Sequence, residues 1–316
     1  MNALNRPTPQ ANLIRVAPTS ALQWQAEFML PASSPVFGGH YPGNPLVPGV
    51  YLVEAALQAL ALAGGAPRVR RVLDLRLMHS VGPGQVLRLM AHCIDNREDG
   101  RRWQVSLARD ETAVARFKLE YERAAAVPPS LTAPPEPDAG WRHWDATRIV
   151  SRLAHRSPIL LVDEAHGEPG GQWLLAHKLI SLNEPCFAAI PPRVSAERLH
   201  YPDVLVLESL VQASGLLVGD EARIHHQVML LGGVRSVEFY APAAPGDVLR
   251  HELRVLRRLG DTALVGGVTR VGRRLIAVVN EVLIALRGPG ALHANPATAQ
   301  TAAAVVAAAE PEAVPD

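Results

Sequence analysis

Residues 38–58 read GGHYPGNPLVPGVYLVEAALQ, and this stretch decides the fold. His40 stands ahead of a Pro-Gly turn, and Glu54 and Gln58 fall in the apolar run that follows. That run is apolar nearly all round, which predicts a buried core helix rather than a surface helix. Alternating strands surround it, and an antiparallel sheet wrapped around one buried helix is an α+β arrangement.

A second copy of the pattern lies in the other half of the chain. Residues 200–212 read HYPDVLVLESLVQ and repeat the proline turn, the apolar helix, Glu208 and Gln212. Asp203 is placed to cap this helix. The preceding loop, CFAAIPPRV, has no histidine. One base, two candidate acids and a duplicated scaffold predict a single catalytic site shared between the two halves.

A second pair of landmarks supports the duplication. The hexamers PGQVLR (83–88) and PGDVLR (245–250) each precede an alternating segment. Their first prolines are 162 residues apart and the two helix glutamates are 154 apart, so the offsets are nearly equal. The predicted organisation is an N-terminal extension (1–19), a first unit (20–124), a Pro/Ala-rich linker (125–140), a second unit (141–288) and a disordered tail (289–316).

Composition excludes several classes of protein. The 316 residues carry a formal net charge of +1 with mixed signs, which argues against a dedicated nucleic-acid binder. The two cysteines lie in different halves and suggest no disulfide framework. No apolar run is long enough to span a membrane, and the N-terminus lacks a signal-peptide core. We therefore predict a cytoplasmic protein.

The helix glutamates and the turn before them suit acid–base chemistry. Burial disfavours a charged carboxylate and raises its pKa, which makes a proton donor near neutrality. Gln58 and Gln212 lie at i+4 from their glutamates, so each amide can bond its carboxyl. A glutamate satisfied only structurally by its own glutamine is the alternative, and recurrence in both halves favours function. Gly49 opens the first helix, where an unpaired N–H suits a developing oxyanion.

The motif GHYPGNPLVPGVYLVEAALQ resembles the signature of the hotdog-fold β-hydroxyacyl-ACP dehydratases of bacterial fatty-acid synthesis. HRSPILLVDEA (155–165) and LNEPCF (182–187) resemble that family's N-terminal helix–strand segment and the loop before its histidine. Two copies in one chain resemble the double-hotdog dehydratase domains of polyketide synthases. This resemblance implies two antiparallel sheets, each wrapping a buried central helix.

The resemblance also implies how the site is assembled across the two units. His40 and Gly49 of the first unit should meet Glu208, supported by Gln212, of the second. Glu54 and Gln58 would face a degenerate second site. Counting forward from Asn183 puts Ile190 at the missing histidine position, and counting back from Glu208 gives Val194. Neither side chain takes a proton.

Other polar residues have weaker patterns. His200 precedes Glu208 by eight residues, whereas His40 precedes Glu54 by fourteen, so we do not expect His200 to be catalytic. His155 is interpreted as a structural residue of the N-terminal segment. His79 and the pair His225-His226 lack partners at metal-ligand spacing. The cluster Arg68, Arg70 and Arg71 is interpreted as a solvated strand edge, or alternatively as a carrier-protein contact.

The resemblance implies dehydration of a 3-hydroxyacyl thioester to a trans-2-enoyl thioester, without cofactor or metal. An acyl carrier protein is the expected partner, and the apolar helices would line the acyl tunnel. Two alternatives stay open: a hotdog thioesterase that uses a helix carboxylate and a water, and a non-catalytic acyl-binding partner. The composition favours a polyketide or polyene pathway weakly, and oligomerisation beyond the internal pseudo-dimer is open.

Overall fold

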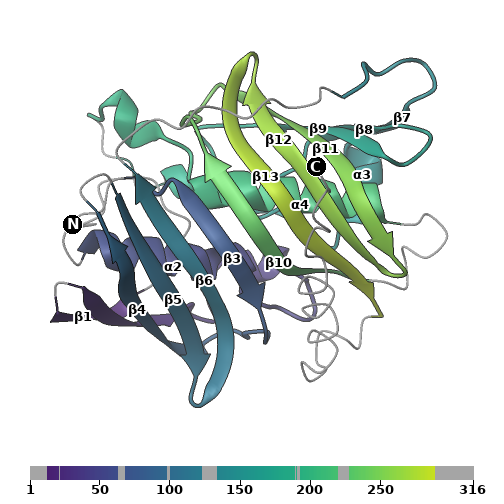
Figure 1. Ribbon diagram of the computed structural model, residues 1–316. Coiled ribbons are helices and arrows are strands. Elements are labelled where there is room, and N and C mark those ends of the chain that lie inside the picture. Colours follow the sequence, from purple (N-terminus) through teal and green to yellow (C-terminus); the bar gives the residue numbers. More distant parts are fainter. Residues whose placement is uncertain are drawn as a thin grey trace, which may run out of the picture.

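A computed structural model gives the fold (Figure 1) and describes residues 13–20, 22–62, 68–97, 100–122, 134–188, 190, 193–219 and 228–288. The helices are α1 (Val36–Gly39), α2 (Gly49–Leu62), α3 (Ala146–Arg152) and α4 (Asp203–Val218), with 3-10 turns η1 (Pro185–Phe187) and η2 (Ala196–Leu199). The strands of the first half are β1 (Leu13–Ser20), β2 (Gln23–Met29), β3 (Arg71–Leu77), β4 (Val86–Asn96), β5 (Gly100–Arg109) and β6 (Thr112–Glu122). Those of the second half are β7 (Arg142–Trp144), β8 (Glu164–Gly167), β9 (Trp173–Leu179), β10 (Val228–Phe239), β11 (Val248–Leu259), β12 (Thr262–Val271) and β13 (Arg274–Arg287).

The strands of the described residues form one continuous sheet in the order β1-β2-β4-β5-β6-β3-β10-β13-β12-β11-β9-β8-β7. Outward from the β3·β10 junction, each half follows the same chain order, which is the duplication expected from the sequence. The two antiparallel sheets expected from the resemblance are joined edge to edge into this one sheet. β3 and β10 pair antiparallel, from Arg71 opposite Glu238 to Arg76 opposite Gly233. This pairing satisfies the backbone groups that each half would otherwise leave at an exposed edge.

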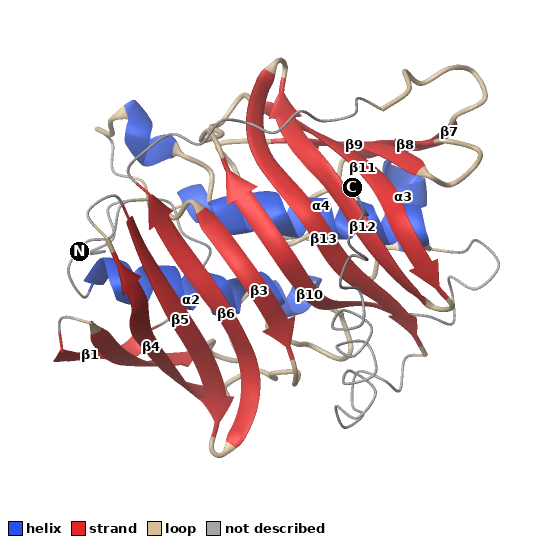
Figure 2. Cartoon of the chain, viewed as in Figure 1, coloured by secondary structure: helices blue, strands red, loops and turns tan. Residues whose placement is uncertain are grey.

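The two apolar helices lie side by side on one face of the sheet (Figure 2). In α2 every residue from Val50 to Leu60 is buried, and in α4 every residue from Val204 to Val218 is buried. This confirms the prediction of core helices. It also explains why their polar residues matter, since a carboxyl here has little access to water.

The duplicated hexamers begin equivalent strands. β4 starts three residues after Pro83, and β11 starts three residues after Pro245. Between proline and strand, Gly84 (φ +73°) and Gly246 (φ +93°) both adopt the left-handed conformation that glycine tolerates without strain. The same type of turn therefore precedes the equivalent strand in each half.

The arginine cluster does not lie at a sheet edge, because β3 lies between β6 and β10; its alternative interpretation as a carrier-protein contact stays a prediction. Arg68 makes a two-pronged ion pair with Asp203, with N–O distances of 2.8 and 2.6 Å. Asp203 is thus the first residue of α4 and a partner of Arg68, not the helix cap, which is Pro202. Arg70 is buried over the ring of Tyr240.

Arg71 is ion-paired with Glu120 and Glu238. Arg68 and Arg71 thus each pair with a carboxylate of the other half, Asp203 and Glu238 respectively.

Several predicted segments have only a partial outcome. β1 lies mostly within the expected N-terminal extension, and it pairs with β2. Most of the linker, the tail after residue 288 and His225-His226 lie outside the described residues. No helix in the described ranges combines the length and apolarity that a membrane crossing requires.

Candidate active site

His40 follows α1 directly and is buried, with 8% of its surface exposed. Its Nδ1 lies 2.7 Å from the carbonyl oxygen of Leu46. A carbonyl only accepts hydrogen bonds, so Nδ1 carries the proton and the neutral ring keeps a lone pair on Nε2. Burial lowers the pKa of His40 to about 4, although the Leu46 bond opposes this. His40 is therefore a neutral imidazole with a basic Nε2 at neutral pH.

Glu208 projects from the second turn of α4 and is 4% exposed. Gln212 donates from Nε2 to Glu208 Oε1 over 2.8 Å. Gln212 is itself fixed, because it accepts from the N–H of Leu161 and donates to the carbonyl of Ile159. Burial raises the pKa of Glu208 to about 7, and the Gln212 bond lowers it only partly. A large part of Glu208 is thus protonated at neutral pH.

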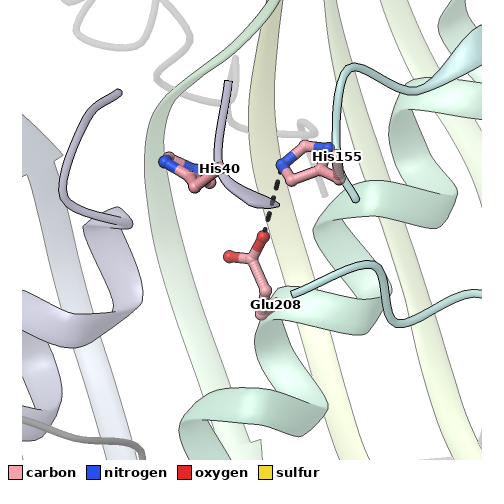
Figure 3. A group of neighbouring side chains, drawn as sticks. All are labelled: His40, His155 and Glu208. Atoms are coloured by element: carbon pink, nitrogen blue, oxygen red, sulfur yellow. Dashed lines mark ion pairs between the residues drawn. The ribbon is translucent and has the colours of Figure 1, made fainter. Parts of the chain in front are cut away.

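His155 is the third member of the cluster, and the sequence interpretation missed it. Its Nε2 lies 3.6 Å from Glu208 Oε1 (Figure 3). Its ring centroid lies 5.3 Å from that of His40. One nitrogen or oxygen from each of His40, His155 and Glu208 lies within 4.8 Å of the others. Burial, followed by the charges of His40 and Arg156, lowers the pKa of His155 well below its ordinary value.

Two loops from different halves meet to build this cluster. The N–H of Arg156 donates to the carbonyl of Gly39 over 2.8 Å. A Cβ on Gly39 would lie only 2.4 Å from the carbonyl oxygen of Arg156, so only glycine permits this approach. The contact holds His40 beside His155. The only sequence signal for His155 was its place in HRSPILLVDEA, which gave no indication of this tertiary contact.

Tyr41 closes the cluster toward β10. It adopts a left-handed backbone (φ +56°), and its hydroxyl donates to the carbonyl of Met229. Its ring centroid lies 4.7 Å from that of His40 and 5.4 Å from that of His155. A pocket with about 500 Å³ of empty space, part of it open to solvent, begins beside these rings. Its lining includes Tyr41, His155, Gly215, Leu216 and Met229.

Gly49 is the first residue of α2, as the sequence predicted. Its backbone N–H is among those that have no acceptor within the helix. A Cβ at this position would lie 2.4 Å from Leu77 Cδ1, so the helix start packs tightly on β3. Gly49 and His40 thus belong to one loop-and-helix segment.

The second glutamate has different surroundings. Glu54 is fully buried and accepts a hydrogen bond of 3.0 Å from Gln58. Burial, followed by the charge of Glu184, raises the pKa of nearby Cys186 to about 12, so this thiol stays neutral. Ile190 is partly buried and packs against the hydrophobic core. His40 and His155 both lie in the cluster with Glu208.

Comparisons with known proteins agree with this geometry. A family model described as ApeI-like, ApeI dehydratase, matches residues 17–118. The chain is 36% identical over 131 residues to the 3-hydroxyacyl-[acyl-carrier-protein] dehydratase FabZ of Pasteurella multocida, covering 41% of this chain and 84% of that protein. It is 38% identical over 124 residues to the FabZ of Mannheimia succiniciproducens, covering 39% of this chain and 80% of that protein.

Solved structures match nearly the whole chain. The dehydratase domain from the CurJ module of curacin polyketide synthase has a TM-score of 0.63 at 13% identity, over 92% of this chain and 99% of that domain. The dehydratase domain of RzxB from Pseudomonas fluorescens has a TM-score of 0.62 at 14% identity, over 86% and 97%. At such low identity these structures establish the fold alone. Together with the FabZ relatives, they show that the chain belongs to the family of hotdog-fold hydroxyacyl dehydratases.

Proposed function

We propose that this protein removes water from a 3-hydroxyacyl thioester and releases a trans-2-enoyl thioester. One observation carries the proposal: His40 of the first half and Glu208 of the second lie in one buried cluster. The FabZ relatives share the chemistry by name. We propose further that 20–124 and 141–288 are the two units of a fused double hotdog.

We propose one step for each residue. Nε2 of His40 takes the α-proton, and the electron pair moves into the thioester as its carbonyl oxygen becomes negative. The N–H of Gly49 stabilises that oxygen. The Cβ–O bond then breaks, and Glu208 gives its proton to the leaving hydroxyl, which departs as water. The product keeps a double bond between Cα and Cβ, and solvent restores the two protonation states.

The electrostatics of the site suit this sequence of steps. The reaction needs a neutral base and a protonated acid at the same pH. Burial lowers the pKa of His40 to about 4 and raises that of Glu208 to about 7, so both forms coexist between these values. The thioester itself acidifies the α-carbon, so the proposal invokes neither cofactor nor metal. His155 is proposed as a positioning residue that holds the Glu208 carboxyl toward His40.

The substrate and partner follow from the same proposal. We propose that an acyl carrier protein presents the acyl chain, as the names of the FabZ relatives suggest for those proteins. The pocket beside Tyr41 and His155 is proposed to admit the thioester, and α4 to line the path of the acyl chain. We propose that the protein serves fatty-acid, polyketide or polyene biosynthesis. Cytoplasmic location stays a prediction.

Three variants test the assignment on a panel of 3-hydroxyacyl carrier substrates, with products identified by mass spectrometry. His40→Ala and Glu208→Gln should abolish formation of the enoyl product. Glu54→Gln is the matched control, because it makes the same change in the other helix, and it should retain activity. Loss of activity in Glu54→Gln alone would refute the pairing of His40 with Glu208. Release of free thiol without an enoyl product would select a thioesterase, and tight carrier binding without turnover would select a non-catalytic partner.

A further inference from the structure

A second group of titratable side chains lies on the edge strands of the second half. His143 stands on β7, Glu164 and His166 on β8, and His177 on β9. His143 is directly opposite His166, and Glu164 is directly opposite His177. Glu164 and His166 are two residues apart on one strand, so all four side chains share one face of the sheet.

This face points away from the core. The intervening residues Trp144, Ala165 and Ala176 are all buried, so the alternate positions project outward. The four side chains are between 29% and 50% exposed, so a dissolved ion can reach the group, although Nδ1 of His177 itself is buried. None of them belongs to the cluster around Glu208.

The distances match those of a metal-ligand set. Nε2 of His143 lies 2.9 Å from Glu164 Oε1, and Nε2 of His166 lies 3.4 Å from the same oxygen. Nδ1 of His177 lies 3.7 Å from Glu164 Oε2. Ligands about 2.0–2.1 Å from a tetrahedral zinc ion are about 3.3 Å apart. His143, Glu164 and His166 each place a ligand atom within 4.8 Å of the other two, and His177 lies beside the other carboxylate oxygen, so a rotation of its ring would complete the set.

The polar surroundings also favour a cation. Glu164 supplies a carboxylate that faces all three imidazoles, and Nδ1 of His177 has no hydrogen-bond partner among the described residues. Arg250 lies opposite His177 on β11, but its guanidinium is within 3.5 Å of Glu252, which offsets its charge.

We propose that His143, Glu164, His166 and His177 bind a divalent transition-metal ion, with Zn²⁺ the best match to imidazole and carboxylate ligands. The ion links three adjacent strands, of which β7 has only three residues and is the outermost of the sheet. Its role is to fasten β7 and β8 onto β9, and it takes no part in dehydration. The sequence does not predict this site, because its ligands come together through cross-strand pairing and not through close spacing in the chain.

Isothermal titration of the full-length, metal-stripped protein with ZnCl₂ tests the proposal. We expect one strong site, at least tenfold weaker binding in His166→Ala and in His143→Gln, and no strong binding of Mg²⁺. His92→Ala, at an exposed histidine on β4, is the matched control and should bind like the parent protein. Zn²⁺ should also raise the Tm of the parent by a few degrees and leave that of His166→Ala unchanged.

Two results would overturn the proposal. One is the absence of a strong Zn²⁺ site in the parent protein. The other is a site that survives in both His166→Ala and His143→Gln but is lost in His40→Ala, because that ion would occupy the cluster at Glu208. The two substitutions at exposed positions protect the test against one variant failing to fold, which circular dichroism would reveal. Enoyl-product formation is not a readout here, so the outcome is independent of the proposed dehydratase.

Discussion

Raising the pH from 7 to 9 should switch off the proposed reaction, because the acid loses its proton. Glu208 has a pKa of about 7 as a result of burial, so about one half of the molecules carry that proton at pH 7 and about one hundredth at pH 9. The base sets no limit in this range, since His40 is neutral above about pH 4. We therefore expect kcat/KM to fall about 50-fold between pH 7 and pH 9.

The assay measures the initial rate of enoyl-thioester formation at several concentrations of a 3-hydroxyacyl carrier substrate, up to saturation. It is repeated at half-unit steps of pH. Glu54→Gln should reproduce the parent profile, whereas Glu208→Gln should lose at least about 100-fold at every pH. A profile that is flat from pH 6 to pH 9 would refute the assignment of Glu208 as the acid. So would a profile that rises through pH 7, because a carboxylate base behaves in that way.

The same pKa predicts a stability effect that separates lost chemistry from lost folding. The folded protein holds a proton on Glu208 that an unfolded chain releases above its ordinary pKa of 4.5. Stability contributed by this group is therefore lost as pH rises from 4.5 to about 7, by on the order of 3 kcal/mol. Glu208→Gln carries no such charge, so it should be no less stable than the parent at pH 8 in urea unfolding.

Three further predictions concern the surroundings of the site. Gly39→Ala should destabilise the protein by about 1–3 kcal/mol and lower activity, because the new Cβ would clash with the carbonyl of Arg156. Gly38→Ala, which has open space around it, should leave stability in urea unfolding nearly unchanged, and equal effects of the two variants would contradict the contact. His155→Ala should lower kcat about 10- to 100-fold, because His155 Nε2 faces Glu208. It should also shift the pH at which activity falls on the alkaline side of the profile, and an unchanged alkaline fall would exclude a positioning role for His155. The buried thiol of Cys186 has a pKa of about 12, so at pH 8 it should react with a disulfide reagent only when the protein unfolds. Labelling is located by peptide mass spectrometry, and fast labelling of the folded protein would contradict the prediction.

Much of the architecture could be predicted because it depends on local sequence patterns. The all-round apolar runs predicted α2 and α4, and the repeated Pro-Gly hexamers predicted the starts of β4 and β11. The catalytic pairing of His40 with Glu208 comes from the resemblance and stays a prediction, although both side chains lie in one cluster. Each of these inferences depends on residues that are close in sequence, or on a motif with fixed spacing.

The rest depends on register between distant strands, which spacing does not encode. The junction of β3 with β10 places the predicted arginine cluster where the two halves meet, with Arg68 paired to Asp203. His155 joined the site because Gly39 lets two loops from different halves touch. The histidines on β7, β8 and β9 came together through cross-strand pairing alone.

The mirrored strand order about the β3·β10 junction has a consequence for how this chain can change over evolutionary time. In a symmetric homodimer one gene encodes both subunits, so any substitution appears twice and neither copy can specialise. Here the two copies are inherited as separate stretches of a single reading frame. The first loop carries His40 and the loop CFAAIPPRV of the second carries no histidine, and each glutamate can be mutated without touching its counterpart. Covalent fusion thus lets the two copies diverge independently.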